Sequence, residues 1–234
     1  MKNRILLFFS LAAAFVFADG GQKGSFTDPR DGQTYKTVKI GNQVWMAENL
    51  NYAYLQPTSS LDSSSFCYRN KPDSCAKYGR LYLWSAAMDS AGVFGDGGKG
   101  CGYEVTCSAK EPVRGICPEG WHLPSKAEWR TLMETVGGED VAGKKLKSKS
   151  GWDDDEGKRG NGTDEYGFSV LPAGYRSGDG DYYRAGEDAG FWSSSEYSGL
   201  NAYSWNFYYA REYVCSLYDN ESHGVSVRCL RDLD

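Results

Sequence analysis

The chain has 234 residues, of which 26 are Lys or Arg and 31 are Asp or Glu, so its formal net charge at pH 7 is −5. This acidic balance argues against nucleic acid and anionic membrane surfaces as partners, because both repel a negatively charged protein. The 29 glycines and the 15% aromatic content favour short strands, frequent turns and loops packed by aromatic side chains.

The N-terminus has the pattern of a signal peptide. Lys2 and Arg4 precede an apolar run over residues 5–17, and Val16-Phe17-Ala18 has the form of a cleavage site. The run of about 13 residues is short for a membrane span, and no later segment of the mature chain is apolar enough to be a transmembrane helix. We expect residues 1–18 to be removed, and the protein to be secreted, extracellular or at the outer cell surface, with the periplasm as an alternative.

We expect the mature chain to form a single domain. Residues 19–26 are polar and rich in glycine, and we expect them to form a flexible lead. Residues 27–234 contain no internal repeat and no linker that would divide them. Two strand-like segments, Thr34–Ile40 and residues 43–50, flank the turn signal Gly41-Asn42, which predicts a hairpin.

Helical patterns occupy the middle of the chain. Residues 81–90 predict a short buried helix, and residues 139–149 predict another short helix. Between them, Ser125 and Glu128 have the spacing of a capping box, and Gly137-Gly138 supplies a stop. The apolar residues between cap and stop recur on one helix face: Trp129, Leu132, Met133 and Val136.

The C-terminal half predicts strands and long loops. Residues 150–165 form a long polar loop, and residues 168–171 begin a strand that breaks at Pro172. Residues 178–181 predict a tight turn. Four strand-like runs then follow at the spacing of an antiparallel meander: residues 191–195, 202–210, 213–218 and 224–230.

All seven cysteines lie in the part expected to be exported, so disulfides are expected. Spacing suggests two local bridges and one that closes a long loop: Cys67–Cys75, Cys101–Cys107 and Cys117–Cys229. Cys215 is left over, and we expect it to be a buried free thiol in a strand, with an intermolecular bridge or a reactive thiol as alternatives.

Five ordered motifs resemble those of the Fibrobacter succinogenes major paralogous domain. They are Asn-Gln-Val-Trp-Met-Ala-Glu-Asn-Leu at 42–50, Tyr-Gly-Arg-Leu-Tyr at 78–82, Gly-Trp-His-Leu-Pro-Ser at 120–125, Leu-Pro-Ala-Gly-Tyr-Arg at 171–176 and Ser-Val-Arg-Cys at 226–229. The resemblance implies an exported, surface-exposed protein, but it implies no particular ligand or reaction.

A more distant resemblance is to the C-type-lectin-like fold that formylglycine-generating enzymes share. It implies an α+β fold with twisted antiparallel sheets, two or three short helices, long loops and disulfides. The ends of such a fold lie side by side in one sheet, and a Cys117–Cys229 bridge fits that topology.

The acidic loop could bind calcium, which takes about six to eight oxygen ligands from flexible loops. C-type lectins place calcium in a comparable loop, but the chain lacks their Glu-Pro-Asn or Gln-Pro-Asp tripeptide and their Trp-Asn-Asp motif. The alternative is a solvated acidic loop beside Lys158 and Arg159. We expect no other cofactor. The candidate ligands are Asp153, Asp154, Asp155 and Glu156.

A group of aromatic and charged residues could bind a sugar or a peptide. Aromatic faces cover the apolar C–H surface of a sugar, and neighbouring charges bond its hydroxyls. Tyr197 and Tyr203 extend the aromatic group, and the alternative is that these rings pack the loops of the domain. The candidate ligand-binding residues are Trp152, Tyr175, Arg176, Asp181, Tyr182, Tyr183 and Arg184.

The leading functional hypothesis is therefore a non-catalytic surface domain that binds a polysaccharide or a surface protein. The alternatives are a structural paralogue without a small ligand, and an enzyme, either a formylglycine-generating-enzyme-like oxidase or a glycosidase. The oxidase would need a free thiol pair, but Cys229 is expected in a disulfide. His122 lies in a structural motif and is predicted to be a packed, hydrogen-bonded residue, while His223 has no evident partner.

Overall fold

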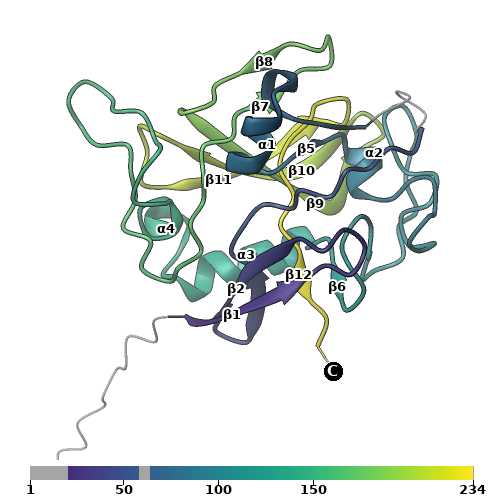
Figure 1. Ribbon diagram of the computed structural model, residues 1–234, viewed down its shortest axis with the longest axis horizontal. Coiled ribbons are helices and arrows are strands. Elements are labelled where there is room, and N and C mark those ends of the chain that lie inside the picture. Colours follow the sequence, from purple (N-terminus) through teal and green to yellow (C-terminus); the bar gives the residue numbers. More distant parts are fainter. Residues whose placement is uncertain (1–20, 58–63, 234) are drawn as a thin grey trace, which may run out of the picture.

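The structure is a computed structural model that describes residues 21–57 and 64–233. The signal peptide expected over residues 1–18 lies outside this range. The described chain is a mixed α/β fold with antiparallel sheets, short helices and three disulfides (Figure 1). No helix within that range is long and apolar enough to cross a membrane.

The first sheet joins the beginning and the end of the described chain. Its strand order is β1-β2-β3-β12-β6, and β12 pairs with β3 on one side and with β6 on the other. The predicted hairpin is confirmed, because β2 and β3 pair across the Gly41-Asn42 turn. The strands are β1 (Gln22–Thr27), β2 (Thr34–Ile40), β3 (Gln43–Met46), β6 (Trp121–His122) and β12 (Leu230–Arg231).

Strand β1 occupies most of the segment for which a flexible lead was expected. Gln22 pairs with Lys39 and Thr27 with Thr34, so β1 is the edge strand of this sheet. All of its residues except Phe26 are exposed. The segment therefore lacks the hydrophobic alternation that would have marked it as a strand.

The second sheet is a three-stranded antiparallel meander in the order β11-β10-β9. Its strands are β9 (Asp188–Ser198), β10 (Asn201–Tyr208) and β11 (Val214–Asn220). The prediction that residues 224–230 form a fourth strand of this meander was wrong. Its first part makes isolated bridges to Arg176, Tyr82 and Phe191, and its end joins the first sheet as β12. The Cys117–Cys229 bridge holds this end beside the first sheet.

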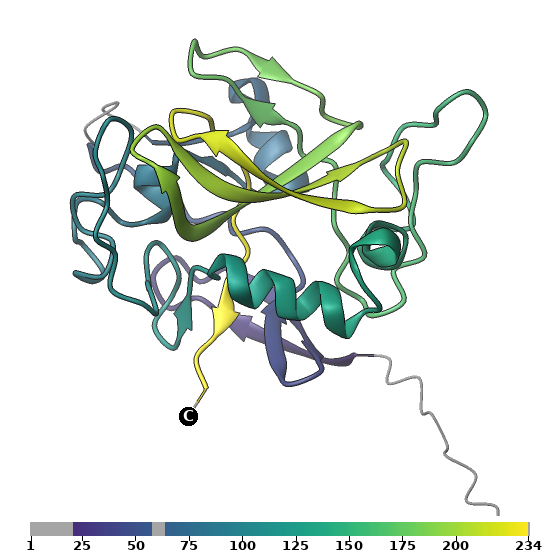
Figure 2. The same ribbon diagram turned by 180° about the vertical axis from the view of Figure 1, so that it is seen from behind.

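Helix α3 (Lys126–Thr135) lies between the two sheets (Figure 2). Its capping box is formed as predicted, with Glu128 N–H donating to Ser125. The Trp129 ring lies 4.7 Å from that of Trp45 in the first sheet and 6.5 Å from that of Trp205 in the second. This row of indoles forms the centre of the hydrophobic cluster around α3. Helix α4 (Glu139–Leu146) follows and contacts β11.

Short elements cover the face of the second sheet that points away from α3. Two hairpins are formed, β4 (Ser65–Phe66) with β5 (Leu81–Tyr82) and β7 (Tyr175–Arg176) with β8 (Tyr182–Tyr183). The 3-10 helix η1 (Tyr68–Asn70), α1 (Pro72–Tyr78) and α2 (Trp84–Ala87) complete the fold. The helix expected over residues 81–90 is thus shorter, because its first two residues pair as a strand.

The strand expected over residues 168–171 is not formed. Val170 makes only an isolated bridge to Lys147. The carbonyl groups of Phe168 and Ser169 instead accept hydrogen bonds from the guanidinium of Arg228. Arg228 is fully buried. In a sheet, these two carbonyls would have accepted hydrogen bonds from the backbone N–H groups of a neighbouring strand.

All three predicted disulfides are confirmed: Cys67–Cys75, Cys101–Cys107 and Cys117–Cys229. Cys215 is a free thiol on β11, as predicted, and it is half-buried rather than buried.

Candidate functional site

A cavity of about 290 Å³ lies on the face of the second sheet that points away from α3. On β10 the side chains of Trp205 and Phe207 belong to the hydrophobic cluster around α3. Because side chains alternate along a strand, Asn206 and Tyr208 point to the opposite face, where they line the cavity. The segment carrying β7 and the loop after β11 border it on the other side.

Two glycines shape this cavity. Gly190 on β9 pairs with Asn206 and places no side chain in the space. Gly174 has a φ of +65°, and a Cβ atom there would lie 2.2 Å from the carbonyl oxygen of Tyr183. Only glycine permits so close an approach. Any side chain at Gly174 would therefore displace hairpin β7–β8 from its place beside the sheet.

Aromatic rings form one wall of the cavity. The ring of Tyr175 lies 5.8 Å from that of His223, with 31° between the planes, and 5.6 Å from that of Tyr183, also at 31°. Tyr183 is 42% exposed, so this row of rings runs from the cavity to the surface. Burial lowers the pKa of His223, although Asp219 acts in the opposite direction. The imidazole is therefore uncharged at neutral pH.

Polar groups occupy the opposite wall. Oδ2 of Asp188 accepts from Arg184 at 3.1 Å, whereas its Oδ1 is buried and has no hydrogen-bond partner among the residues that the structure describes. Burial raises the pKa of Asp188, and Arg184 opposes this shift. Oδ2 of Asp219 accepts from Ser204 at 2.5 Å, and Asn206 donates to the same hydroxyl at 2.8 Å. Asp188, which lines the cavity, thus has one buried carboxylate oxygen that accepts no hydrogen bond from the described residues.

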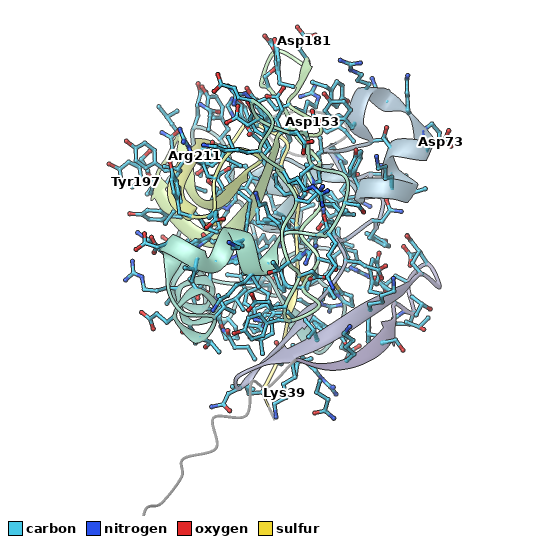
Figure 3. The ribbon with its side chains drawn as sticks, turned by 90° about the vertical axis from the view of Figure 1, so that its left-hand side faces the viewer. Lys39, Asp73, Asp153, Asp181, Tyr197 and Arg211 are labelled. Carbon is cyan, nitrogen blue, oxygen red and sulfur yellow. A yellow bond between two sulfur atoms is a disulfide. The ribbon has the colours of Figure 1, made fainter. Side chains whose placement is uncertain are left out.

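The predicted ligand-binding residues are only partly brought together. Tyr175 and Arg184 line the cavity, and Tyr183 stacks against Tyr175 at its edge. Asp181 lies at the tip of hairpin β7–β8 and points outward (Figure 3). Its carbonyl group accepts from the backbone N–H of Ser177, which closes the turn.

Two further members of the predicted set hold the hairpin in place. The guanidinium of Arg176 lies 4.2 Å from the ring centre of Phe66. The hydroxyl of Tyr182 donates to Asn70 at 2.8 Å. Both side chains pack β7–β8 against the neighbouring short elements, so they support the cavity without lining it.

Trp152 is a correction to the predicted ligand surface. It is only 4% exposed, and its indole N–H donates to the carbonyl of Val170 and to the hydroxyl of Ser148. A residue sealed in the core in this way has no face left for a ligand. Its apolar ring anchors the long acidic loop to the domain instead.

The tyrosines added to the aromatic group lie on the other face of the second sheet. Tyr197 stacks on Tyr218 with ring centres 4.2 Å apart and 8° between the planes. Tyr203 lies edge-on to Tyr197. These rings cover one another, so they form a patch of their own that is separate from the cavity.

The acidic loop does not gather its carboxylates around one point. Asp153 lies against Gly186, Asp154 accepts from the N–H of Gly160, and Asp155 is in a turn closed by its backbone bonds with Lys158. Across the ranges that the structure covers, no group of three or more His, Cys, Asp or Glu side chains is arranged to hold a metal ion.

Several cavity residues were not predicted: Asp188, Asn206, Tyr208, Asp219 and His223. Three of them alternate with apolar residues on β9 to β11, and that alternation is the only signal that the sequence carries. It places them on one sheet face, but only the pairing of the strands brings Asp188 opposite Tyr208.

A second cluster surrounds His122, which is packed and hydrogen-bonded as predicted. Its Nδ1 lies 2.6 Å from Asp232 and its Nε2 lies 2.9 Å from Glu128. Burial lowers the pKa of His122, but the bonds to the two carboxylates outweigh burial and raise the pKa above its ordinary value. With both ring nitrogens hydrogen-bonded, the side chain ties the end of the chain to α3.

This histidine makes a testable contribution to stability. Its raised pKa means that the stabilisation is complete below the unfolded-state value of about 6.5 and is lost as the pH rises through the folded-state pKa. We expect His122→Gln to cost about 1–2 kcal/mol at pH 5.5 and less at pH 9, since Asp232 is half-exposed and solvent weakens the pair. Thermal unfolding at both pH values measures this.

The matched control is His223→Gln. The pKa of His223 is lowered, so protonation of this side chain disfavours the folded state. Relative to wild type, we therefore expect His223→Gln to have a higher free energy of unfolding at pH 5.5 than at pH 9. A His122→Gln effect that stays constant or grows between pH 5.5 and pH 9 would contradict the assignment.

The comparisons with known proteins assign a family but no activity. The family model described as the Fibrobacter succinogenes major domain matches residues 38–231, a range that contains every residue of the cavity. Neither the search of curated proteins nor the search of solved structures found a match.

Proposed function

We propose that this chain, which belongs to the Fibrobacter succinogenes major domain family, is an exported, non-catalytic domain that binds neutral carbohydrate in the cavity between hairpin β7–β8 and the second sheet. The observation that carries the proposal is the pairing of an aromatic wall, Tyr175 with His223, with the unused Oδ1 of Asp188.

The chemistry of the cavity suits a sugar. The face of Tyr175 offers an apolar surface to the C–H side of a sugar ring, and Asp188 and Asn206 offer hydrogen-bonding groups to its hydroxyls. The volume of about 290 Å³ lies at the low end for ligand pockets. This size favours one sugar residue, such as the end of a chain or a side branch.

The surrounding charges favour a neutral ligand over an acidic one. Asp188 and Asp219 line the cavity against a single Arg184, and Arg184 is already paired with Asp188. Asp179 and Asp181 lie in the adjoining hairpin turn. A uronic acid or a sulfated sugar would be repelled at this position.

We also propose a C-type-lectin-like architecture. Strands β1 and β12 lie in one sheet, and the Cys117–Cys229 bridge joins the last strand to the region before α3. Three disulfides fit an oxidising, extracellular setting. The proposed location is the outer cell surface or the surrounding medium.

The binding function has more support than the oxidase. Six of the seven cysteines are paired, and Cys229, the other cysteine late in the chain, is bonded to Cys117. Cys215 therefore has no second free thiol with which to form a reactive pair. At the cavity, Asp188 and Asp219 are each bonded to a neighbouring side chain, which suits acceptors of ligand hydroxyls.

A binding experiment tests this proposal. The mature domain is mixed with plant fibre and with soluble neutral glucans, xylans and mannans, with calcium and with chelator. We expect retention on at least one neutral glycan, and we expect Tyr175→Ala to weaken it at least tenfold, because the variant loses a stacking surface of about 1–1.5 kcal/mol as well as the packing of His223.

Tyr197→Ala is the matched control, because Tyr197 is an exposed tyrosine on the opposite face of the sheet. It should leave binding unchanged. Loss of retention with chelator alone would place calcium in the site. No retention on any glycan in either condition, or equal retention by Tyr175→Ala and wild type, would defeat the proposal.

A further inference from the structure

A second cavity, of about 150 Å³, lies between α4, the loop of residues 155–163 and the turn after β10. Its lining has an unusual charge for a protein with a net charge of −5. Five cationic side chains and two carboxylates surround it, a local excess of three positive charges. They are Lys144, Lys147, Lys158, Arg159 and Arg211, with Asp155 and Glu212.

The carboxylates do not neutralise this cavity. Glu212 is paired with Lys144 at 2.9 Å, which removes one charge of each sign. Among the residues placed by the structure, Lys158, Arg159 and Arg211 form no ion pair. Their guanidinium and ammonium groups are donors without an anionic acceptor.

Lys147 lies beneath these exposed cations. It is only 3% exposed, and its ammonium group donates to the carbonyls of Tyr208, Tyr209 and Arg211 at 2.9, 3.2 and 3.0 Å. These three bonds fix a positive charge at the wall of the cavity. Burial lowers the pKa of Lys147 to about 8, and a nearby anion would favour its charged form.

A neutral donor adds to this arrangement. Asn161 lines the cavity, and its Oδ1 accepts from the backbone N–H of Trp152. That bond fixes the orientation of the amide and leaves its NH2 group to donate. The buried Trp152 thus holds both the loop and the amide in place.

We propose that this cavity binds a small oxyanion, namely a phosphate, a sulfate or the carboxylate of an acidic sugar. The site does not depend on the carbohydrate cavity, whose charge has the opposite sign. It also reassigns the acidic loop, which delivers Lys158, Arg159 and Asn161 to an anion site. The anion comes either free from solution or as a substituent of a polysaccharide, and both sources share the same chemistry.

The test uses thermal unfolding and calorimetric titration of the mature domain. Phosphate and sulfate at about 10–20 mM are compared with chloride at equal ionic strength, and oligogalacturonate is compared with a neutral glucan. For millimolar affinity we expect the wild-type Tm to rise by about 2–6 °C. The double variant Lys158→Gln/Arg159→Gln should lose at least tenfold in affinity.

Lys39→Gln is the control, because it removes one positive charge from β2, at a residue that does not line this cavity. It should respond as wild type does. Phosphate and sulfate also stabilise proteins without binding them, so an equal rise in Tm for all three proteins overturns the proposal, as does no rise and no heat with any anion. Binding of inorganic anions alone identifies a free ion as the ligand, and binding of oligogalacturonate identifies an acidic sugar.

Discussion

The double variant Cys117→Ala/Cys229→Ala should unfold about 10–20 °C below wild type. The bridge spans 112 residues, and in the chain-entropy model closing a loop of this length contributes about 5 kcal/mol to stability. For a domain of this size, each kcal/mol changes the Tm by about 2–4 °C. The bridge also holds β12 between β3 and β6, so its loss weakens the sheet that joins the two ends of the chain. Scanning calorimetry measures the shift.

Cys101→Ala/Cys107→Ala is the control, because that bridge spans only 6 residues. The same model gives it roughly 2–2.5 kcal/mol, about half the effect. Equal shifts for the two double variants, or an unchanged melting curve for Cys117→Ala/Cys229→Ala, would show that the long bridge does not hold the fold together.

Arg228→Met should lower the free energy of unfolding by about 3–5 kcal/mol. Arg228 is fully buried, and its guanidinium donates to the side-chain oxygen of Asn49 and to the carbonyls of Phe168 and Ser169. It also lies 4.4 Å from the ring centre of Phe168. Without it, three buried acceptors lose their donor, and residues 168–169 lose their attachment to the last segment of the chain.

Burial lowers the pKa of Arg228 to about 9, and no carboxylate in the described part of the chain forms an ion pair with this side chain. Three separate nitrogens of the Arg228 guanidinium each donate to a different acceptor. Arg228→Lys should therefore recover little stability, because a lysine carries a single nitrogen that cannot occupy all three positions. Arg231→Met is the control, because the side chain of Arg231 is exposed, and it should change stability by less than about 0.5 kcal/mol. Chemical denaturation compares them. An Arg228→Met variant as stable as Arg231→Met would contradict the assigned role.

Local signals in the sequence were enough to predict the elements that depend on neighbouring residues. The Ser125–Glu128 capping box and the Gly41-Asn42 hairpin are both formed. The disulfides followed from spacing and from the count of cysteines. Each of these features is decided within a few residues or by a covalent constraint, so the sequence carries the information directly.

Elements decided by distant contacts were missed. Strand β1 is exposed along most of its length, and only its pairing with β2 makes it a strand. Residues 224–230 have the pattern of a fourth meander strand, but the bridge at Cys229 and the burial of Arg228 take the end of this segment to the first sheet. A periodic pattern cannot show which sheet a strand joins.

The candidate site was predicted in part for the same reason. Tyr175 and Arg184 were identified from the cluster of aromatic and charged residues in their segment. Asp188 and His223 lie in different segments, and they meet Tyr175 only because β7 bridges to the loop after β11 and β9 passes beneath it. Trp152 was misassigned because nothing in its polar surroundings shows that its ring is buried.

The two cavities give the domain two regions of opposite charge. The first offers aromatic rings and carboxylates, and the second offers cations and one amide. A ligand that carries both neutral and acidic sugars could meet both. Each proposed site is tested by its own variants, so an experiment that contradicts one binding proposal leaves the other intact.

The measurement that tests the central claim most directly is a titration of the mature, isotope-labelled domain with a neutral oligosaccharide, followed by amide chemical shifts in NMR spectra. We predict that the largest changes fall on residues around the first cavity, among them Tyr175, Asn206 and His223. We also predict that Tyr175→Ala abolishes these changes. Shifts confined to the Tyr197–Tyr218 patch, or no shifts with any neutral glycan, would contradict it.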